Sequence, residues 1–525
     1  MAEGADFPKK ETDAPSGLWF WLLTGFLLLP WIYIQSNTSV NSDVAWLSIC
    51  AERIIDGGTF FSDCYDTNPP LSTFLYIPFI WLSQITRIAT YHILFWGTLT
   101  TIGLGTFLTY RILAFMPSLS VNERLIICAT YLFTLTVIPT IYFAERDHFL
   151  ALMILPFIVL QFCISDRKKT PALLSYTILL FGSMTLLLKP HYGLIPLIIF
   201  IHRMISQRRI FIIFDKDFLT LTLLTALYIS SVILFYPDFI SFMLPDILST
   251  YAGYNNIAGT YLSSLPYGAL IIFTGLLTLR ARGNFGKFVK LWWVCAALGL
   301  CCYVIQMKGF TYHRLPLYSL IFPLLSALIA HAVIHVAKKP DNKGIAVLAL
   351  FMIAALSYTA SPLRPDYATH SAYINNEITQ YIDEQCTEPC AFYITHNNMD
   401  IVSQIGFYSP HTYATRFPSF WFMTANAHLS DQEILNKTSQ YGQYIAEDLD
   451  RYTPSLLLIL AKTEDQGEFT NDMDVAQIFA VSDEFKSALS NYDKIDRLTV
   501  DRAYFYKDTP YDFPYELTWD VYKRR

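Results

Sequence analysis

Residues 41–71 read NSDVAWLSICAERIIDGGTFFSDCYDTNPPL and form a polar stretch between apolar ones. Asp43, Asp63 and Asp66 lie in this stretch, which ends in Asn68-Pro69-Pro70-Leu71. Carboxylates are costly to place at the rim of a membrane, so they usually mark a site of chemistry or transport. We therefore expect a membrane protein with a polar loop at one face of the bilayer.

The composition indicates a polytopic membrane protein. Of the 525 residues, 53% are hydrophobic and only 15% are charged. The mean hydropathy of +0.36 exceeds that of an ordinary soluble domain. The net charge of -6 is spread along the chain, which leaves no basic footprint for nucleic acid.

Eleven apolar runs each approach the roughly 20 residues that a bilayer requires. They fall at about 18–35, 91–115, 124–142, 148–164, 171–188, 192–205, 212–236, 262–279, 288–306, 314–336 and 344–360. The apolar segment 71–88 follows two prolines, contains Pro78 and carries Gln84 and Arg87. We expect an interfacial or re-entrant helix there rather than a full span.

The distribution of basic residues sets the orientation. If the N-terminal tail 1–17 is cytoplasmic, the basic loops all fall on the cytoplasmic side, as the positive-inside rule requires. These loops are 166–169, 203–209, 280–290 and 338–343. The first apolar run lacks a small-residue cleavage pattern and contains three Trp residues, so we expect it to be retained rather than removed as a signal peptide.

The region 361–525 then lies outside the cytoplasm and differs in composition from 18–360, the predicted transmembrane domain with its outer loop 36–70. Short apolar runs at 392–395 and 456–460 predict strands. Helical periodicity at Ile374, Ile378 and Ile382 predicts a helix, and a second helix is expected over 475–490. The fold class is therefore an α-helical polytopic membrane protein with a small C-terminal α/β domain outside the cytoplasm.

Four of the nine cysteines lie outside the apolar runs, as the pairs Cys50 and Cys64, and Cys386 and Cys390. An oxidising compartment could bridge both pairs, and a bridge needs Cα separations of about 4.4–6.8 Å. Four free thiols are the alternative. A metal site at Cys386 and Cys390 is the least supported of these alternatives, because the sequence shows no third and fourth ligand.

Asp43 begins a segment that predicts a short amphipathic helix, which ends in a turn at Gly57-Gly58. Asp43 would stand at the N-terminus of this helix and face the membrane surface. It is then either a functional carboxylate or only a helix N-cap, a position that Asp often takes.

A second acidic group follows the third apolar run, where Glu145-Arg146-Asp147-His148 stands between Phe143 and Phe149. It lies one hairpin away from the loop of Asp43, so the two acidic groups can converge at the same membrane rim. Surface charges at helix ends are the alternative.

Basic residues occur at outer ends of the apolar runs, where positive charge is otherwise scarce. They lie in Lys189-Pro190-His191-Tyr192-Gly193 and in Lys308-Gly309-Phe310-Thr311-Tyr312-His313-Arg314. Such groups could hold a lipid phosphate, although snorkelling side chains explain single cases as well.

With these motifs the chain resembles the GT-C glycosyltransferases, membrane enzymes that take sugars from polyprenyl-phosphate carriers. The resemblance rests on the early outer-loop Asp43, on Tyr65-Asp66-Thr67-Asn68-Pro69-Pro70-Leu71 before an interfacial helix, and on Asp147 with Glu145 after the third run. It covers roughly residues 18–200. Within the superfamily the chain looks most like bacterial members akin to protein mannosyltransferases and the aminoarabinose transferases of lipid A. Beyond residue 200 or near it, three stretches look like signatures of a less characterised bacterial branch: Lys189 to Gly193, Tyr312-His313-Arg314 and Arg416-Phe417-Pro418-Ser419-Phe420-Trp421.

The resemblance implies an inverting transfer in the bacterial inner membrane, from a polyprenyl-phosphate sugar to a glycan or glycolipid acceptor on the periplasmic face. Asp43 would be the general base, and Asp147 and Glu145 would orient the acceptor or bind a divalent metal such as Mg or Mn. Cations would stabilise the leaving phosphate. The candidates are Lys189, His191, Lys308, His313, Arg314 and Arg146 for the donor phosphate, and Tyr65, Asp66, Asn68, His148 and Arg416 for other substrate contacts.

Arg146 separates the two acids and so departs from the pattern of a metal pair, which leaves metal dependence open.

Two other classes of function compete with the enzyme. A lipid or sugar transporter would also carry charges within the membrane, although such proteins tend to show internal repeats and charges at the midplane. A structural component of an envelope assembly complex would use the outer domain as a binding module.

Overall fold

The computed structural model describes residues 14–208, 210–250, 253, 255–337, 343–361, 369–386, 388–461, 474–501 and 516–525. The chain forms two compact units. Unit 1 comprises residues 1–36, 94–230 and 256–363, and unit 2 comprises residues 37–93, 231–255 and 364–525.

The helices at the eleven apolar runs form unit 1, with a few end residues that belong to unit 2. They are α1 (Ala14–Asn37), α6 (Thr90–Leu113), α7 (Val121–Thr136), α8 (Arg146–Ser165), α9 (Ala172–Leu187), α10 (Leu194–Gln207), α11 (Lys216–Phe235), α13 (Ile257–Arg280), α14 (Gly283–Ile305), α15 (Leu315–Ala337) and α16 (Lys343–Ala360). Among the described residues, 8 helices are long and apolar enough to cross a membrane. The helices α7, α9 and α10, of 16, 16 and 14 residues, are shorter. A helix thus lies at every predicted run, and the count of eleven spans stays a prediction.

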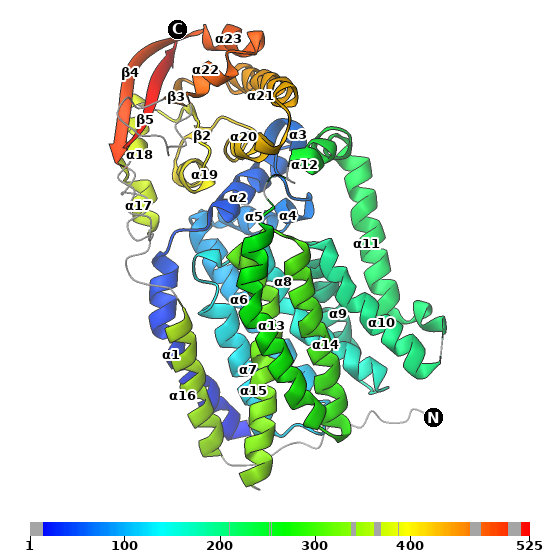
Figure 1. Cartoon of the computed structure of the whole chain (residues 1–525). Coiled ribbons are helices and arrows are strands. Elements are labelled where there is room, and N and C mark those ends of the chain that lie inside the picture. Colours follow the sequence, from blue (N-terminus) through cyan, green and yellow to red (C-terminus); the bar gives the residue numbers. More distant parts are fainter. Residues whose placement is uncertain are drawn as a thin grey trace. The chain divides into compact units, whose positions relative to one another are not determined.

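The core of unit 1 is built around α7 and α8. Nearly every side chain of these two helices is buried, and the Tyr131 hydroxyl of α7 donates to the Ala151 carbonyl of α8 at 2.8 Å. The helix α15 packs on both of them, while α13, α14 and α15 lie side by side (Figure 1). The helix in the predicted run 124–142 is shorter than that run. The helix α7 ends at Thr136, and a 3-10 turn follows at Thr140–Tyr142.

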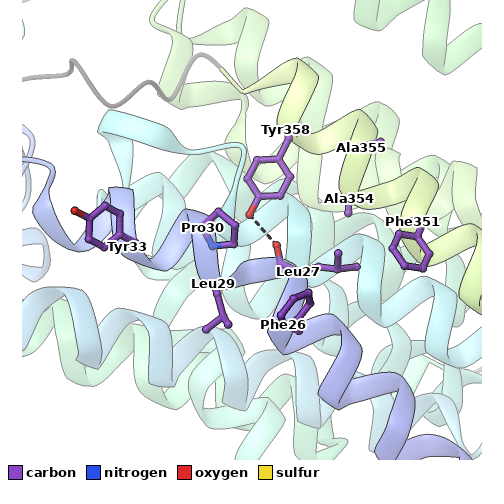
Figure 2. A pocket seen from close by; sticks show the side chains of 9 residues that line it. All are labelled: Phe26, Leu27, Leu29, Pro30, Tyr33, Phe351, Ala354, Ala355 and Tyr358. Carbon is purple, nitrogen blue, oxygen red and sulfur yellow. Dashed lines mark hydrogen bonds between the residues drawn. The ribbon is translucent and has the colours of Figure 1, made fainter.

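An apolar groove of about 650 Å³ lies on α1 and α16, lined by residues such as Phe26, Leu29 and Phe351 (Figure 2). The Tyr358 hydroxyl donates to the Leu27 carbonyl at 2.9 Å. It also accepts a hydrogen bond from the Trp31 backbone N–H at 3.3 Å. These contacts fall beside Pro30, which cannot donate a backbone hydrogen bond, so a side chain of α16 supports α1 where its own hydrogen-bond ladder is interrupted.

The segment after the double proline is too short for a full span. It forms α4 (Leu71–Phe74) and α5 (Ile77–Thr86), which ends at Arg87 with a left-handed φ of 57°. These bounds agree with the prediction that 71–88 does not cross the membrane as one continuous helix.

Unit 2 contains a five-stranded sheet of order β2-β1-β3-β5-β4 (Figure 1). Its strands are β1 (Ala391–Ile394), β2 (Thr412–Tyr413), β3 (Leu456–Leu460), β4 (Tyr492–Asp501) and β5 (Glu516–Arg524). The strand β1 runs parallel to β2 and β3, whereas β5 is antiparallel to β3 and β4. The small C-terminal α/β domain predicted from the sequence is therefore confirmed, as are its strands near 392–395 and 456–460.

Helices cover the rest of unit 2. They are α2 (Ser42–Ile55), α3 (Phe60–Asp63), α12 (Leu244–Thr250), α17 (His370–Ile374), α18 (Glu377–Gln385), α19 (Met399–Tyr408), α20 (Trp421–Ala425), α21 (Asp431–Tyr452), α22 (Val475–Phe479) and α23 (Asp483–Leu489). The single helix predicted over 475–490 is wrong, because the Ser482 side chain caps a new helix after α22.

The first outer loop is joined to the C-terminal region within unit 2. The Val40 backbone N–H donates to the Tyr408 hydroxyl at 2.9 Å, and one guanidinium nitrogen of Arg53 donates to the carbonyls of Asp63 and Thr415. A half-buried guanidinium that donates to carbonyls from both segments fixes them against each other.

Both predicted disulfides are present. Cys50 and Cys64 are bridged with a Cα separation of 5.3 Å, and Cys386 and Cys390 with a separation of 5.9 Å. The alternatives of free thiols or of a metal bound by Cys386 and Cys390 are therefore wrong for this structure.

Candidate active site

A lysine joins three segments of unit 1 that are far apart in the sequence. Lys189 follows α9, and its Nζ lies 3.1 Å from Asp147 Oδ2 in the first turn of α8. The same Nζ lies 3.3 Å from His313 Nε2, in the 3-10 turn that precedes α15. We call Asp147, Lys189 and His313 the Lys189 cluster.

The acidic side of this site is deeply buried. The side chains of Glu145 and Asp147 are 0% exposed and that of Arg146 is 3% exposed. Arg146 Nε lies 3.6 Å from Glu145 Oε2. Buried charges persist only when they are paired and hydrogen-bonded, so the ion pairs with Arg146 and Lys189 make this burial possible.

Strained backbone flanks two of the three chain segments of the site, those of Asp147 and His313. Thr140 and Ala144, just before Glu145, have φ values of 53° and 68°, and Met307, just before Lys308, has a φ of 53°. Non-glycine residues rarely adopt such angles, and they concentrate at functional sites. No sequence pattern predicts this strain.

His313 offers a hydrogen-bond donor to the site. The ammonium of Lys189 can only donate, so His313 Nε2 must accept from it, and the ring proton then lies on Nδ1. Within the described part of the chain, this buried Nδ1 has no hydrogen-bond partner. The charges of Lys189, Arg146 and Lys308 act on His313 electrostatically, so His313 lies near these predicted phosphate-binding residues.

His191 is not the cation that its position in the sequence suggested. Burial, reinforced by the nearby charge of Lys189, lowers the pKa of His191 to about 4. Its imidazole is therefore neutral at physiological pH, and its Nε2 has no hydrogen-bond partner among the described residues. Burial also lowers the pKa of Lys308.

Two other predicted residues have local partners. Both nitrogens of His148 are used by the backbone: Nε2 contacts the Leu135 carbonyl at 2.7 Å, and Nδ1 accepts from the Ala144 N–H at 3.1 Å. Arg314 donates from Nε to the Tyr303 hydroxyl at 3.3 Å and lies over the rings of Tyr303 and Tyr267. A direct substrate contact by His148 would require one of its backbone bonds to break.

Asp43 lies in the first turn of α2 in unit 2 and is half-buried. It is not the N-cap, because Asn41 takes that position and its side chain accepts from the Asp43 N–H at 3.0 Å. The N-cap alternative for Asp43 is therefore wrong, and its carboxylate does not serve as that helix's cap.

Asp400, which the sequence reasoning missed, lies next to Asp43. Its Oδ1 accepts from the Ser42 hydroxyl at 2.6 Å, and it stands in the first turn of α19. The charge of Asp43 acts on the Asp400 carboxylate, and the Ser42 hydrogen bond stabilises that carboxylate. No motif marks Asp400, because only the packing of α19 on α2 brings the two aspartates together.

The other candidates in unit 2 hold the loop in place. Asp66 accepts from the Asn68 backbone N–H at 2.7 Å and from the Asn68 side-chain amide at 2.5 Å. The Tyr65 hydroxyl donates to Asp246, a residue that the sequence reasoning also missed. The role of Tyr65, Asp66 and Asn68 in substrate binding stays a prediction.

Arg416 forms a buried ion pair. Its Nε lies 2.7 Å from Asp448 Oδ1 and its Nη2 lies 2.9 Å from Glu447 Oε2. Its third nitrogen, Nη1, has no hydrogen-bond partner among the described residues. Arg416 thus has a structural partner and one remaining donor, and its substrate contact stays a prediction.

Asp43 belongs to unit 2, whereas the Lys189 cluster belongs to unit 1. The structure brings together Asp147, Lys189 and His313 within unit 1 and Asp43 with Asp400 within unit 2. The convergence of Asp43 with Asp147 at one outward-facing pocket stays a prediction.

No family model and no curated protein sequence matches the chain. Solved structures match over most of its length. ArnT from Cupriavidus metallidurans bound to undecaprenyl phosphate is 10% identical with a TM-score of 0.49, over 95% of this chain and 97% of ArnT. The oligosaccharyltransferase from Archaeoglobus fulgidus is 10% identical with a TM-score of 0.41, over 92% of this chain and 73% of that one. The arabinofuranosyltransferase AftD from Mycobacteria is 11% identical with a TM-score of 0.44, over 96% of this chain and 40% of AftD.

All three are GT-C glycosyltransferases, the superfamily that the sequence motifs resemble. At these identities and TM-scores, the likeness assigns no activity, substrate or site residue to this chain.

Proposed function

We propose that this protein is an inverting glycosyltransferase of the bacterial inner membrane. It moves a sugar from a polyprenyl-phosphate donor to a cell-envelope glycan or lipid acceptor on the outer face. The observation that carries the proposal is the Lys189 cluster, in which a half-buried ammonium and an imidazole N–H from separate segments lie beside a buried carboxylate.

The Lys189 cluster suits a leaving phosphate. Charge accumulates on the phosphate oxygens as the bond to the sugar breaks, and preformed donors in a water-poor site stabilise that charge most strongly. Lys189 offers its ammonium and His313 offers Nδ1–H. Asp147 holds the ammonium in place and keeps the site near neutrality before the donor binds.

Asp43 is the proposed base. The acceptor hydroxyl loses its proton to the Asp43 carboxylate while its oxygen attacks the anomeric carbon of the sugar. The bond from that carbon to the phosphate oxygen breaks on the opposite side, and the phosphate leaves with the electron pair. Asp400 is a positioning residue, because its hydrogen bond to Ser42 fixes the first turn of α2.

The acidic residues have cationic partners from the chain itself. Lys189 contacts Asp147 and Arg146 contacts Glu145. Among the described residues, the side-chain groups arranged to hold a metal ion do not include Glu145 or Asp147. This donor set does not fit a divalent metal pair, so no step of the proposed mechanism runs through one.

The proposed orientation places the N-terminus in the cytoplasm and residues 361–525 in the periplasm. The two disulfides support it, since both lie in segments that this orientation puts outside the cytoplasm, where disulfides persist.

The test uses the purified full chain in proteoliposomes with a polyprenyl-phosphate sugar that carries a label in the sugar. We expect the label to pass to an acceptor from an envelope lipid extract, with release of polyprenyl phosphate. Lys189→Met should abolish transfer, whereas Lys486→Met, at an exposed lysine of α23, should leave it unchanged. Movement of intact donor across the bilayer without transfer would instead indicate the transporter, and neither activity would indicate a structural component; both results contradict the proposal.

A further inference from the structure

A second group of ionisable side chains lies in unit 1, away from the Lys189 cluster. Glu123 stands in the first turn of α7, and His331 and His335 stand near the end of α15. One possible ligand atom from each of these three residues lies within 4.8 Å of the others. At 1.5 Å per residue, the stretch of α15 from Leu315 to His331 is roughly 24 Å long, so this group is separate from His313. We call Glu123, His331 and His335 the Glu123 cluster.

The carboxylate of Glu123 is held in a fixed direction. Its Oε2 accepts from the backbone N–H and the hydroxyl of Ser120, at 2.6 and 2.7 Å, in a capping box at the start of α7. Its Oε1 lies 2.7 Å from His331 Nδ1. Glu123 is buried, so one oxygen belongs to the helix cap and the other faces the two histidines.

The two histidines are also preorganised. They are one turn apart on α15 and therefore share a face. His335 Nδ1 lies 2.9 Å from the His331 carbonyl, which can only accept, so the ring proton is on Nδ1 and the lone pair of the neutral ring is on Nε2. Histidine ligands of metals are commonly held by such a second hydrogen bond. The ring of Phe285 stacks on His331 with centroids 3.7 Å apart, which fixes the plane of that imidazole.

We propose that the Glu123 cluster binds a divalent first-row transition ion of the Zn²⁺ class. Two imidazole nitrogens and one carboxylate oxygen are ligands that Zn²⁺ takes, with water as the fourth ligand. Mg²⁺ and Ca²⁺ prefer sets made of oxygen alone. His331 is 24% exposed and His335 is exposed, so an ion has a path to the ligands.

The ion would clamp two core helices of unit 1 together. The helix α7 packs along α15, and the Glu123 cluster joins the start of one to the end of the other. Binding should therefore raise the stability of the folded chain.

The test is a Co²⁺ titration of the purified full chain in detergent, after removal of any affinity tag and treatment with EDTA. We expect one saturable Co²⁺ site per chain in the visible absorption spectrum, displaced by Zn²⁺, and a higher melting temperature with Zn²⁺. His335→Ala should lower the affinity at least tenfold, because it removes a ligand. This side chain is exposed, so the substitution should leave the fold and the metal-free melting temperature unchanged.

His202→Ala is the matched control, because His202 is an exposed histidine on α10 outside the Glu123 cluster. It should bind Co²⁺ as the wild-type chain does. Absence of saturable Co²⁺ binding, or an equal affinity in His335→Ala and the wild-type chain, would overturn the proposal and leave the Glu123–His331 contact as a hydrogen bond alone.

Discussion

At the scale of single residues, the site depends on buried charges whose partners come from elsewhere in the chain. Lys189, Asp147 and His313 could each be selected from the sequence, because an ionisable residue at the end of an apolar run is costly unless it has a role. Their pairing could not be predicted, because it depends on how α8, α9 and α15 pack. The tautomer of His313 follows from that pairing, as does the position of its free N–H donor.

The base and its positioning residue can be separated by substitution. Asp43→Asn should reduce transfer by about a hundredfold or more, the usual scale for a general base, while donor binding persists.

Asp400→Ala should reduce transfer by about tenfold or more, because Ser42 and the first turn of α2 lose their support. Asp400→Asn can still accept from Ser42 and should recover most of the activity. Steady-state transfer rates of the variants measure these effects. Wild-type turnover in Asp400→Ala would refute the positioning role.

The buried pair of Arg416 and Asp448 should matter for stability. Their side chains are 2% and 0% exposed, so Asp448→Ala leaves a buried guanidinium without its main partner. Loss of one partner of a buried pair costs about 3–5 kcal/mol. Asp383→Ala, which removes the half-exposed partner of His411, should cost less than about 1 kcal/mol. Chemical unfolding of the full chain measures both values, and similar small losses in the two variants would contradict the prediction.

His191 should make the folded chain sensitive to acid. Its pKa is about 4 in the folded protein and near 6.5 when unfolded, so the unfolded chain binds a proton over a range in which the folded chain does not. The contribution of His191 to the free energy of unfolding is fully present above about pH 6.5, and it is lost as the pH falls toward 4. His191→Gln should therefore flatten the decline of the melting temperature between these pH values. An unchanged decline would show that His191 does not carry this effect.

At the scale of helices and strands, apolar patterns in the sequence predicted the buried strands and missed the strands that carry exposed charges. The strands β1 and β3 were predicted because their residues are almost all apolar. The strands β4 and β5 were not, because they carry charges such as Asp493, Lys494 and Lys523 in a hairpin at the sheet edge. The helix α12 was missed because only seven residues form it.

The two disulfides should differ in their contribution to stability. The Cys50–Cys64 bridge closes a loop of 14 residues and the Cys386–Cys390 bridge a loop of 4. Loop-closure entropy assigns about 3 kcal/mol to the longer loop and about 2 kcal/mol to the shorter. Replacement of Cys50 and Cys64 by Ser should therefore lower the free energy of unfolding more than replacement of Cys386 and Cys390. Chemical unfolding under non-reducing conditions makes the comparison, and the reverse order would contradict it.

At the scale of the whole molecule, hydropathy alone identified the class of protein and the places where its helices lie. It did not predict that residues 37–93 and 231–255 form one unit with the C-terminal region. That grouping rests on polar contacts such as those of Arg53 and Asp246, which connect segments far apart in the chain.

The orientation in the membrane is testable with reporters. Alkaline phosphatase, which is active only outside the cytoplasm, should be active when fused after Arg525 and inactive when fused after Arg282, between α13 and α14. A fluorescent protein that folds only in the cytoplasm should give the opposite pattern. Cytoplasmic activity after Arg525 would reverse the proposed topology and place both disulfides in a reducing compartment.

The central claim is that the Lys189 cluster holds the donor phosphate in the same cavity that Asp43 faces. A cryo-EM structure of the full chain with bound polyprenyl phosphate measures this directly. The account predicts a phosphate within hydrogen-bond distance, roughly 2.7–3.2 Å, of Lys189 Nζ and His313 Nδ1, with the Asp43 carboxylate lining that cavity. A phosphate bound elsewhere, or an Asp43 carboxylate that opens into a separate region, would contradict it.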